Sequence, residues 1–188
     1  MTKYILHGGK TSANSLDNQK YYLETINIPK KDINLLIVSF ARDPQVWNEK
    51  FEQYRQIFLN LNSDKQINFV LSDPDPKIFT KQIQKADVIF ILGGETIRLM
   101  GYLKNILNLK ELFRDKIIAG SSAGANFLSK YYYTINGEEV RHGLNILDIK
   151  TFPHFESSLI KELEELKNYK EDLPVYTLPE EKFEIIFN

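Results

Sequence analysis

The order of apolar runs and amphipathic segments along the first two thirds of the chain is the feature that most constrains its fold. Short apolar runs occur at residues 4–6, 33–40, 67–71, 86–92 and 117–119, and stretches with helical spacing of apolar residues separate them. A run that is apolar throughout is typical of a strand covered on both faces. Strands that alternate with helices form a parallel sheet. The sequence therefore predicts an α/β fold with a mostly parallel sheet and helices on both faces.

The remaining segments complete this prediction. A helix is expected after Asp43 and Pro44, which have the residue types of an N-cap and a first helical position. A chain of 188 residues with 43% hydrophobic content is suited to one core, so we expect a single domain over residues 1–188. Residues 175–178 and 183–187 are expected to form a hairpin at the sheet edge. Further helices are predicted at residues 17–26, 77–85, 103–112 and 158–170.

The composition argues against several classes of function. With 24 basic and 25 acidic residues, the net charge of −1 provides no general attraction to nucleic acid or to an anionic membrane. The absence of cysteine excludes disulfides, thiolate metal sites and a cysteine nucleophile. No apolar run is long enough for a signal peptide or a membrane span. We expect a cytoplasmic protein, monomeric or homodimeric, that uses no cofactor or metal and acts on a small ligand.

The last of the apolar runs leads into Gly120-Ser-Ser-Ala-Gly124, a Gly-x-Ser-x-Gly sequence. A serine on a sharp turn from strand to helix requires small neighbours, because the backbone folds back beside it. Such a turn would expose the Ser122 hydroxyl and point the Ala123 N–H at a developing oxyanion. The alternative is a tight turn without catalytic function, since small residues also occur where a helix packs closely on a sheet.

A second glycine pair, Gly93 and Gly94, follows the apolar run at residues 86–92. Two glycines at the end of a strand allow backbone amides to approach a ligand closely, although a simple turn between strand and helix has the same sequence. Ligands of parallel α/β sheets bind at the carboxyl ends of the strands. Because this pair and Ser122 both lie at such ends, we expect a functional site there.

A serine nucleophile needs an imidazole to accept its proton. Of the three histidines, His154 is the strongest candidate, because it follows a short strand-like run and a proline. His142 is the second candidate, in a turn beside Arg141. His7 is better interpreted as a hydrogen-bonded structural residue.

A carboxylate that orients the imidazole is also required. The candidates between Ser122 and His154 are Glu138, Glu139 and Asp148. Glu138 directly follows an Asn-Gly turn and is preferred, with Glu139 second. The residues alone leave this choice open.

Three motifs occur in this order along the chain: Leu92-Gly-Gly-Glu-Thr96, Gly120-Ser-Ser-Ala-Gly-Ala-Asn126 and Pro153-His-Phe155. Together they resemble the dipeptidase E and cyanophycinase family of serine peptidases, whose members share a fold similar to class I glutamine amidotransferases. The resemblance extends over nearly the whole chain. It implies a Ser-His-acid hydrolase with Ser122 as nucleophile and His154 as base. It also implies an acid in the loop that contains Glu138, and an oxyanion hole formed by Gly93, Gly94 and Ala123.

The chain departs from the dipeptidase E pattern at two places that concern the substrate. Glu95 stands where the family pattern has asparagine, so Glu95 and Thr96 are expected to contact the substrate, with Glu95 favouring an amine or a basic group. No arginine occurs in residues 155–172, where the family has the one that binds an aspartyl carboxylate. A preference for N-terminal aspartate is therefore not expected.

Two functions of different classes follow from these residues. The leading hypothesis is a serine hydrolase that cleaves short peptides through a Ser-His-Glu triad and an acyl-enzyme. The alternative is a non-catalytic amidotransferase-like domain that binds a small molecule or a partner protein. A true glutamine amidotransferase is disfavoured because that chemistry requires a cysteine thioester, and an α/β-hydrolase esterase is usually longer.

Overall fold

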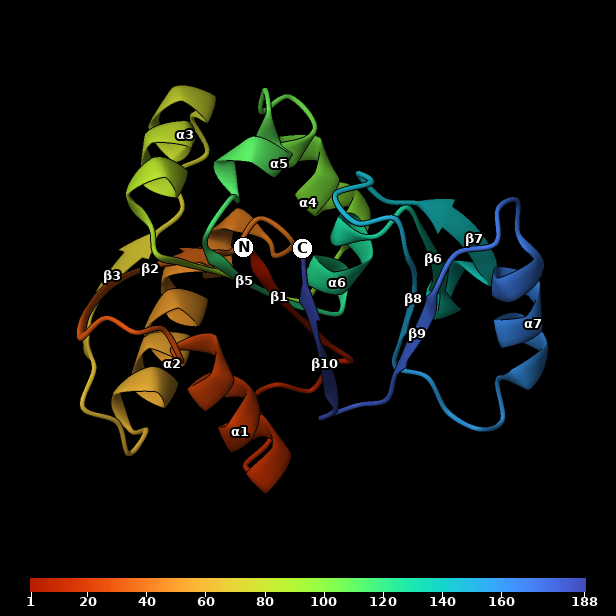
Figure 1. Ribbon diagram of the computed structural model, residues 1–188, viewed down its shortest axis with the longest axis horizontal. Helices are drawn as coiled ribbons and strands as arrows, with labels where there is room; N and C mark the ends of the chain where they lie inside the picture. Colours follow the sequence, from red (N-terminus) through yellow and green to blue (C-terminus); the bar gives the residue numbers. More distant parts are fainter.

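The computed structural model describes residues 1–188 and is built around a six-stranded sheet with the order β10-β1-β5-β4-β2-β3 (Figure 1). All neighbouring pairs are parallel except β1 and β10. The mostly parallel sheet predicted from the sequence is confirmed, because each parallel strand coincides with one of the apolar runs. The strands are β1 (Lys3–His7), β2 (Asp32–Val38), β3 (Gln66–Leu71), β4 (Val88–Ile91), β5 (Ile117–Ser121) and β10 (Phe183–Phe187).

Helices cover both faces of this sheet, as expected for strands that are apolar on both sides. On one face, Tyr21 and Phe58 of α1 and α2 pack against Leu35 and Phe90. On the other face, the core includes buried residues of α3, α4, α5 and α6. The helices are α1 (Leu16–Thr25), α2 (Trp47–Leu59), α3 (Pro76–Lys85), α4 (Thr96–Leu103), α5 (Leu109–Leu112) and α6 (Ala123–Leu128), with a 3₁₀ turn η1 (Pro44–Val46) before α2.

A second sheet of four strands, in the order β7-β6-β8-β9, lies at the right end of the molecule in Figure 1. Its core joins Tyr133 and Phe152 to Leu163 and Leu166 of a covering helix. The elements are β6 (Tyr131–Thr134), η2 (Ile135–Gly137), β7 (Glu139–His142), β8 (Lys150–Pro153), α7 (Ile160–Asn168) and β9 (Val175–Leu178).

The expected hairpin of the last two strands is wrong. β9 pairs in parallel with β8 in the second sheet, whereas β10 crosses to the main sheet and pairs with β1. The reason is that each strand finds an apolar partner in a different core: Val175 packs against the second sheet, whereas Ile185 packs against the main one. The segment between β9 and β10 therefore runs from one sheet to the other.

The helix predicted over residues 103–112 is also interrupted. α4 ends at Leu103 and α5 begins only at Leu109, after Asn108 in the left-handed conformation with φ 55°. Asparagine tolerates this conformation better than most residues, and the intervening Leu107 is 84% exposed. Leu107 therefore contributes nothing to the buried helix face that the leucine spacing suggested.

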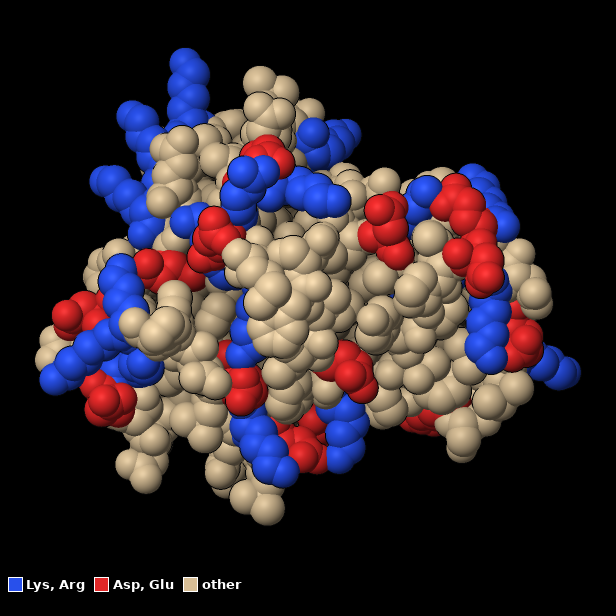
Figure 2. Space-filling model, in the orientation of Figure 1, with Lys and Arg blue, Asp and Glu red and all other residues tan.

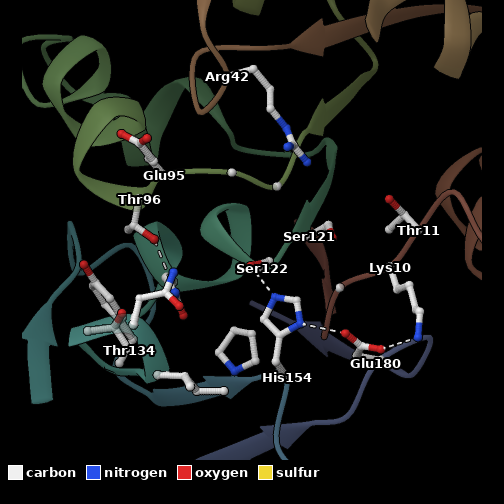
Figure 3. Close-up of a pocket in the computed structure, with 18 of the residues that line it drawn as sticks. Lys10, Thr11, Arg42, Glu95, Thr96, Ser121, Ser122, Thr134, His154 and Glu180 are labelled. Carbon is white, nitrogen blue, oxygen red and sulfur yellow. Dashed lines mark hydrogen bonds and ion pairs between the residues drawn. The ribbon is translucent and has the colours of Figure 1, made fainter. Parts of the chain in front are cut away.

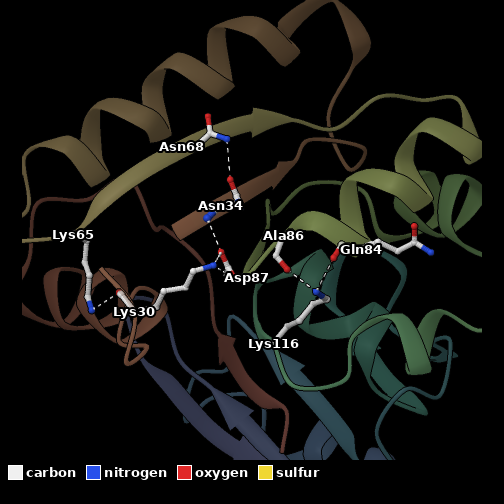
Figure 4. Close-up of polar contacts among 8 residues, drawn as sticks. All are labelled: Lys30, Asn34, Lys65, Asn68, Gln84, Ala86, Asp87 and Lys116. Atoms are coloured by element: carbon white, nitrogen blue, oxygen red, sulfur yellow. Dashed lines mark hydrogen bonds and ion pairs between the residues drawn. The ribbon is translucent and has the colours of Figure 1, made fainter. Parts of the chain in front are cut away.

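Polar contacts tie the amino ends of the main strands together (Figure 4). A carboxylate oxygen of Asp87 accepts the Asn34 N–H at 2.8 Å, and Lys30 Nζ donates to the same carboxylate at 2.9 Å. Lys116 Nζ donates to the Ala86 carbonyl at 2.6 Å. The amino ends are thus closed by structural contacts, and the glycine-rich loops lie at the opposite edge.

Charged side chains of both signs are intermixed on the face drawn in Figure 2, in agreement with a net charge of −1. None of the helices combines the length and the hydropathy needed to cross a bilayer.

Candidate active site

Ser122 occupies a strained turn between β5 and α6. Its backbone has φ 48° and ψ −102°, a region that residues with a side chain rarely adopt. A methyl group on Gly120 would lie 2.6 Å from the Gly124 backbone, and one on Gly124 would lie 2.9 Å from the Ile91 carbonyl oxygen. The two glycines are therefore required by the close approach of α6 to β5 and β4, as the Gly-x-Ser-x-Gly spacing predicted.

His154 lies directly in front of Ser122 (Figure 3). Its Nε2 is 2.8 Å from Ser122 Oγ, a normal hydrogen-bond length for a hydroxyl that donates to an imidazole. His154 follows the last residue of β8 and has φ 56°. Its N–H donates to the Gly8 carbonyl at 3.0 Å, which fixes the loop after β8 to the loop after β1.

The other imidazole nitrogen of His154 faces Glu180. Nδ1 is 3.4 Å from Glu180 Oε1, and Lys10 Nζ is 2.8 Å from Oε2 of the same carboxylate. The contact with Lys10, followed by the one with His154, lowers the pKa of Glu180 below its ordinary value. An ionised Glu180 favours the tautomer in which Nδ1 carries the proton, so the lone pair of Nε2 faces the serine.

Three backbone N–H groups near Ser122 lack a hydrogen-bond partner within their own elements. Ala123 is the first residue of α6, where N–H groups have no intrahelical acceptor. Gly93 and Gly94 follow β4, and neither N–H donates to another backbone or side-chain group. A methyl group on Gly93 would lie 3.4 Å from Cβ of Ser122, so this turn borders the serine directly.

Gly93, Gly94 and Ser122 line a cavity of about 670 Å³ at the carboxyl ends of the parallel strands. Glu95 and Thr96 both line it. The Glu95 carboxylate pairs with Arg98 at 3.3 Å and is 70% exposed, whereas Thr96 Oγ1 accepts a hydrogen bond from Asn126 Nδ2 at 3.3 Å. Glu95 therefore lies at the rim, and Thr96 belongs to the wall. No cluster of three or more His, Asp or Glu side chains is arranged to hold a metal ion.

A comparison with known protein families decides the classification. The model of peptidase family S51 matches residues 10–186, which include Ser122, His154 and Glu180. The chain belongs to peptidase family S51. It is therefore a serine-type peptidase, and the family resemblance inferred from the three motifs is confirmed.

This S51 peptidase is also similar in sequence to an individual curated protein. An uncharacterized peptidase of Listeria monocytogenes is 31% identical over 97 residues, which are 45% of this chain and 47% of that protein. The chain thus matches about half the length of this curated relative.

Solved structures share the fold over the whole chain. A Listeria monocytogenes EGD-e protein provisionally called peptidase E has a TM-score of 0.68 at 19% identity, covering 99% of this chain and 97% of that one. A peptidase from an acI-B1 Actinobacterium has a TM-score of 0.64 at 20% identity, covering 99% and 83%.

The structure does not bring the preferred acid of the sequence prediction to His154. Glu138 is exposed in the turn between β6 and β7 and forms no hydrogen bond with the imidazole. Glu139 pairs with Arg141 instead, at 2.6 Å, and Asp148 is exposed on another loop. The expectation that Glu138 orients His154 is therefore corrected, because Glu180 is the carboxylate that contacts Nδ1.

The position of Glu180 follows from a strand pairing that the sequence did not reveal. β8 and β9 run parallel, with Pro153 opposite Leu178, so the residues that follow the two strands leave the sheet side by side. His154 comes next after β8, and Glu180 comes two residues after β9. A terminal hairpin of residues 175–178 and 183–187, as expected from the sequence, does not include this pairing. The proline before Glu180-Glu181 was the one available signal of a loop at a strand end.

His7 has the structural position expected from the sequence. Gly9 N–H donates to its Nδ1 at 3.0 Å, so Nε2 carries the proton and donates to Asn18 Oδ1 at 2.9 Å. Complete burial lowers the pKa of His7 to about 4, which keeps the ring neutral. These bonds shape the Gly8-Gly9 turn, and a methyl group on Gly9 would overlap Cε1 of His154. The His7 side chain therefore fixes the turn beside the His154 imidazole and forms no hydrogen bond with the Ser122 hydroxyl, whereas the His7 carbonyl accepts the Ser122 N–H at 2.9 Å.

His142, the second histidine candidate, lies outside the site. Its Nε2 is 3.3 Å from Lys170 Nζ, and its ring packs against Tyr131 in the second sheet. Of the three imidazole rings, only that of His154 forms a hydrogen bond with Ser122.

Proposed function

We propose that this S51 peptidase cleaves short peptides through an acyl-enzyme, with Ser122 as nucleophile, His154 as general base and Glu180 as the acid that orients His154. The observation that carries the proposal is the hydrogen bond of 2.8 Å between Ser122 Oγ and His154 Nε2, with Glu180 on the opposite side of the ring. A serine, an imidazole and a carboxylate in this order are the arrangement that serine acyl transfer requires.

In the first half of the reaction, Ser122 Oγ attacks the scissile carbonyl carbon while Nε2 of His154 takes the hydroxyl proton. The positive imidazolium that results is stabilised by the Glu180 carboxylate next to Nδ1. His154 then gives its proton to the leaving amine, the C–N bond breaks, and the acyl group remains on Ser122. In the second half, a water oxygen attacks the acyl carbon while Nε2 of His154 takes a proton from the water. The bond between the acyl carbon and Ser122 Oγ then breaks, His154 returns the proton to Oγ, and the carboxylic acid product leaves.

The oxyanion of each tetrahedral intermediate is proposed to be bound by the N–H groups of Ala123, Gly93 and Gly94. Two observations support this assignment: the N–H groups of the glycine pair have no other acceptor, and Gly93 borders Ser122. Backbone donors fixed before the reaction stabilise developing charge without reorganising. Removing one such donor in a serine protease costs about 10²- to 10³-fold in kcat. Glu95 at the cavity rim remains our proposed contact for a substrate amine.

The proposal is tested with the Ser122→Ala variant. The wild-type protein is expected to hydrolyse members of a dipeptide library and to be labelled by a fluorophosphonate, and Ser122→Ala is expected to do neither. Ser121→Ala is a matched control, because Ser121 is the adjacent serine and forms no bond with His154. Labelling that persists in Ser122→Ala would show that another residue reacts. Absence of both labelling and hydrolysis in the wild type would favour a binding domain.

A further inference from the structure

Arg42 enters the cavity of the proposed active site from the loop after β2, and its guanidinium points toward the glycine turn in Figure 3. The contacts of this loop fix its position. Glu95 N–H donates to the Ala41 carbonyl at 2.9 Å, and a methyl group on Gly94 would overlap that carbonyl. Ala41, the residue before Arg42, therefore packs directly against the Gly93-Gly94 turn. This turn borders Ser122.

The Arg42 guanidinium has no protein partner. Its Nε is buried without a hydrogen bond, and no carboxylate lies within ion-pair distance of the side chain. A buried donor that has lost its water and gained no acceptor costs free energy. Arginine is permanently charged, so it cannot relieve this cost by losing a proton.

The other cations of the cavity are already neutralised. Lys10 pairs with Glu180 at 2.8 Å, and Arg141 pairs with Glu139. Arg42 is thus the cationic side chain of this cavity that is left without a carboxylate.

Two carboxylates flank Arg42 in the chain or across the glycine turn, namely Asp43 and Glu95. Both form contacts with groups other than Arg42. Asp43 accepts the Gln45 N–H at 3.0 Å and also contacts Arg98 at 3.4 Å. The Glu95 carboxylate contacts the same Arg98 at 3.3 Å. Arg98, which does not line the cavity, therefore forms ion pairs with both Asp43 and Glu95. The Arg42 guanidinium remains available to a ligand.

Two hydroxyl groups line the same cavity as Arg42. Thr11 Oγ1 and Tyr54 OH are 2.8 Å apart, both residues line the cavity, and each is 5% exposed. A guanidinium presents parallel N–H donors that match the two oxygens of a carboxylate, and a hydroxyl can donate a further bond. The cavity thus contains groups of the kind that bind a planar anion.

We propose that Arg42 is a specificity-determining residue that binds a carboxylate of the peptide substrate. This inference rests on the proposed peptidase function. The carboxylate is supplied either by the side chain of an acidic first residue or by the free C-terminus of a short peptide. In both cases the guanidinium would bind a carboxylate. The two cases are distinguished by comparing substrates that differ in a single group.

The test compares Asp-Leu with Asn-Leu, which differ in the side-chain carboxylate, and Asn-Leu with Asn-Leu-amide, which differ in the C-terminal one. In one of the two pairs, Arg42→Gln should reduce kcat/KM more for the peptide that carries the carboxylate than for its amide counterpart. We expect the additional loss to be about 10- to 100-fold, which is the range for a charge-assisted hydrogen bond. Arg42→Lys is expected to recover part of the loss, because lysine keeps the charge without the planar fork. Arg55→Gln, in an exposed ion pair with Glu52 on α2, is the control for removing an arginine.

Binding to the Ser122→Ala protein separates this inference from the proposed function. Isothermal titration calorimetry of the same three peptides with Ser122→Ala and with Ser122→Ala/Arg42→Gln needs no turnover. A loss of affinity confined to the carboxylate member of one pair supports the proposal, even if the wild type hydrolyses none of the peptides. Equal affinities in both proteins, or equal losses for both members of each pair, overturn it. Thermal unfolding of each variant verifies that it is folded.

Discussion

Glu180 Oε1 lies 3.4 Å from Nδ1 of His154, and the two residues reach this position from adjacent parallel strands, β8 and β9. The His154 and Glu180 side chains are 40% and 42% exposed, so water reaches the pair. Lys10, on the far side of the carboxylate, lies 2.8 Å from Oε2 and lowers the pKa of Glu180. The proposed acid is thus positioned by two contacts rather than by burial.

The first prediction concerns the identity of the acid. Replacing Glu180 with Gln removes the charge that stabilises the imidazolium, and we expect kcat/KM for a cleaved dipeptide to fall by about 10- to 100-fold. The loss should be smaller than in a buried triad, because solvent screens exposed charges. Glu138→Gln is the matched control and should retain wild-type activity. A loss in Glu138→Gln with none in Glu180→Gln would reverse the assignment.

The second prediction concerns the pH dependence that Lys10 imposes. Lys10 is the main cause of the lowered pKa of Glu180, so Lys10→Met should let that pKa rise toward its ordinary value. A carboxylate with a higher pKa becomes protonated at higher pH. The acidic limb of the kcat/KM profile should therefore move to higher pH in Lys10→Met, with a smaller change at alkaline pH. Lys20→Met, on the exposed side of α1, provides the control profile. Acidic limbs that coincide in the wild type, Lys10→Met and Lys20→Met would contradict the proposed effect of Lys10 on Glu180.

The sequence was sufficient for the parts of the site that depend on local rules. Ser122 required small neighbours on a sharp turn, and Gly93 and Gly94 followed an apolar strand, so their positions could be predicted from spacing alone. Glu180 depends on which strands pair. That pairing is decided by apolar contacts between residues far apart in sequence, and these contacts leave no local pattern.

Gly9 and Arg42 also depend on contacts between residues far apart in the chain, and the sequence did not indicate either residue. Gly9 belongs to a turn that resembles many others, and only the fold shows the imidazole of His154 against it. Arg42 is one of several arginines, and its significance lies in the absence of a partner, which cannot be known before the partners of Asp43 and Glu95 are known.

The third prediction tests the contact between Gly9 and His154. A methyl group at residue 9 would overlap the imidazole, and the φ of 132° is unfavourable for any side chain. Gly9→Ala should lower the free energy of unfolding by about 1–3 kcal/mol and displace His154, reducing kcat by about 10²-fold.

Gly101→Ala is the matched control for this substitution. Gly101 lies within α4, and nothing is within 4 Å of an added methyl group. Alanine in a helix interior is more favourable than glycine by about 0.5–1 kcal/mol, so this variant should be slightly more stable and fully active. Thermal unfolding and dipeptide hydrolysis of both variants measure the two effects. Wild-type kcat in a folded Gly9→Ala protein would show that the turn can move away from the imidazole.

The last prediction concerns stability in acid. His7 has a pKa of about 4 in the folded protein against an ordinary value of 6.5, so the unfolded chain binds a proton in this range that the folded protein does not bind. The contribution of His7 to stability is therefore complete above pH 6.5 and is lost progressively as the pH falls toward 4. The difference corresponds to about 3 kcal/mol in the free energy of unfolding.

The measurement is urea unfolding of the wild type and of His7→Gln at several values between pH 7 and pH 4. Glutamine keeps a side-chain donor for Asn18 and does not titrate, so His7→Gln should lose less stability than the wild type over this interval. Its stability at pH 7 is expected to be lower, because the acceptor for Gly9 N–H is altered. Parallel curves for the two proteins would assign the acid sensitivity to other groups. A smaller slope in His7→Gln would show that protonation of His7 contributes to the loss of stability in acid.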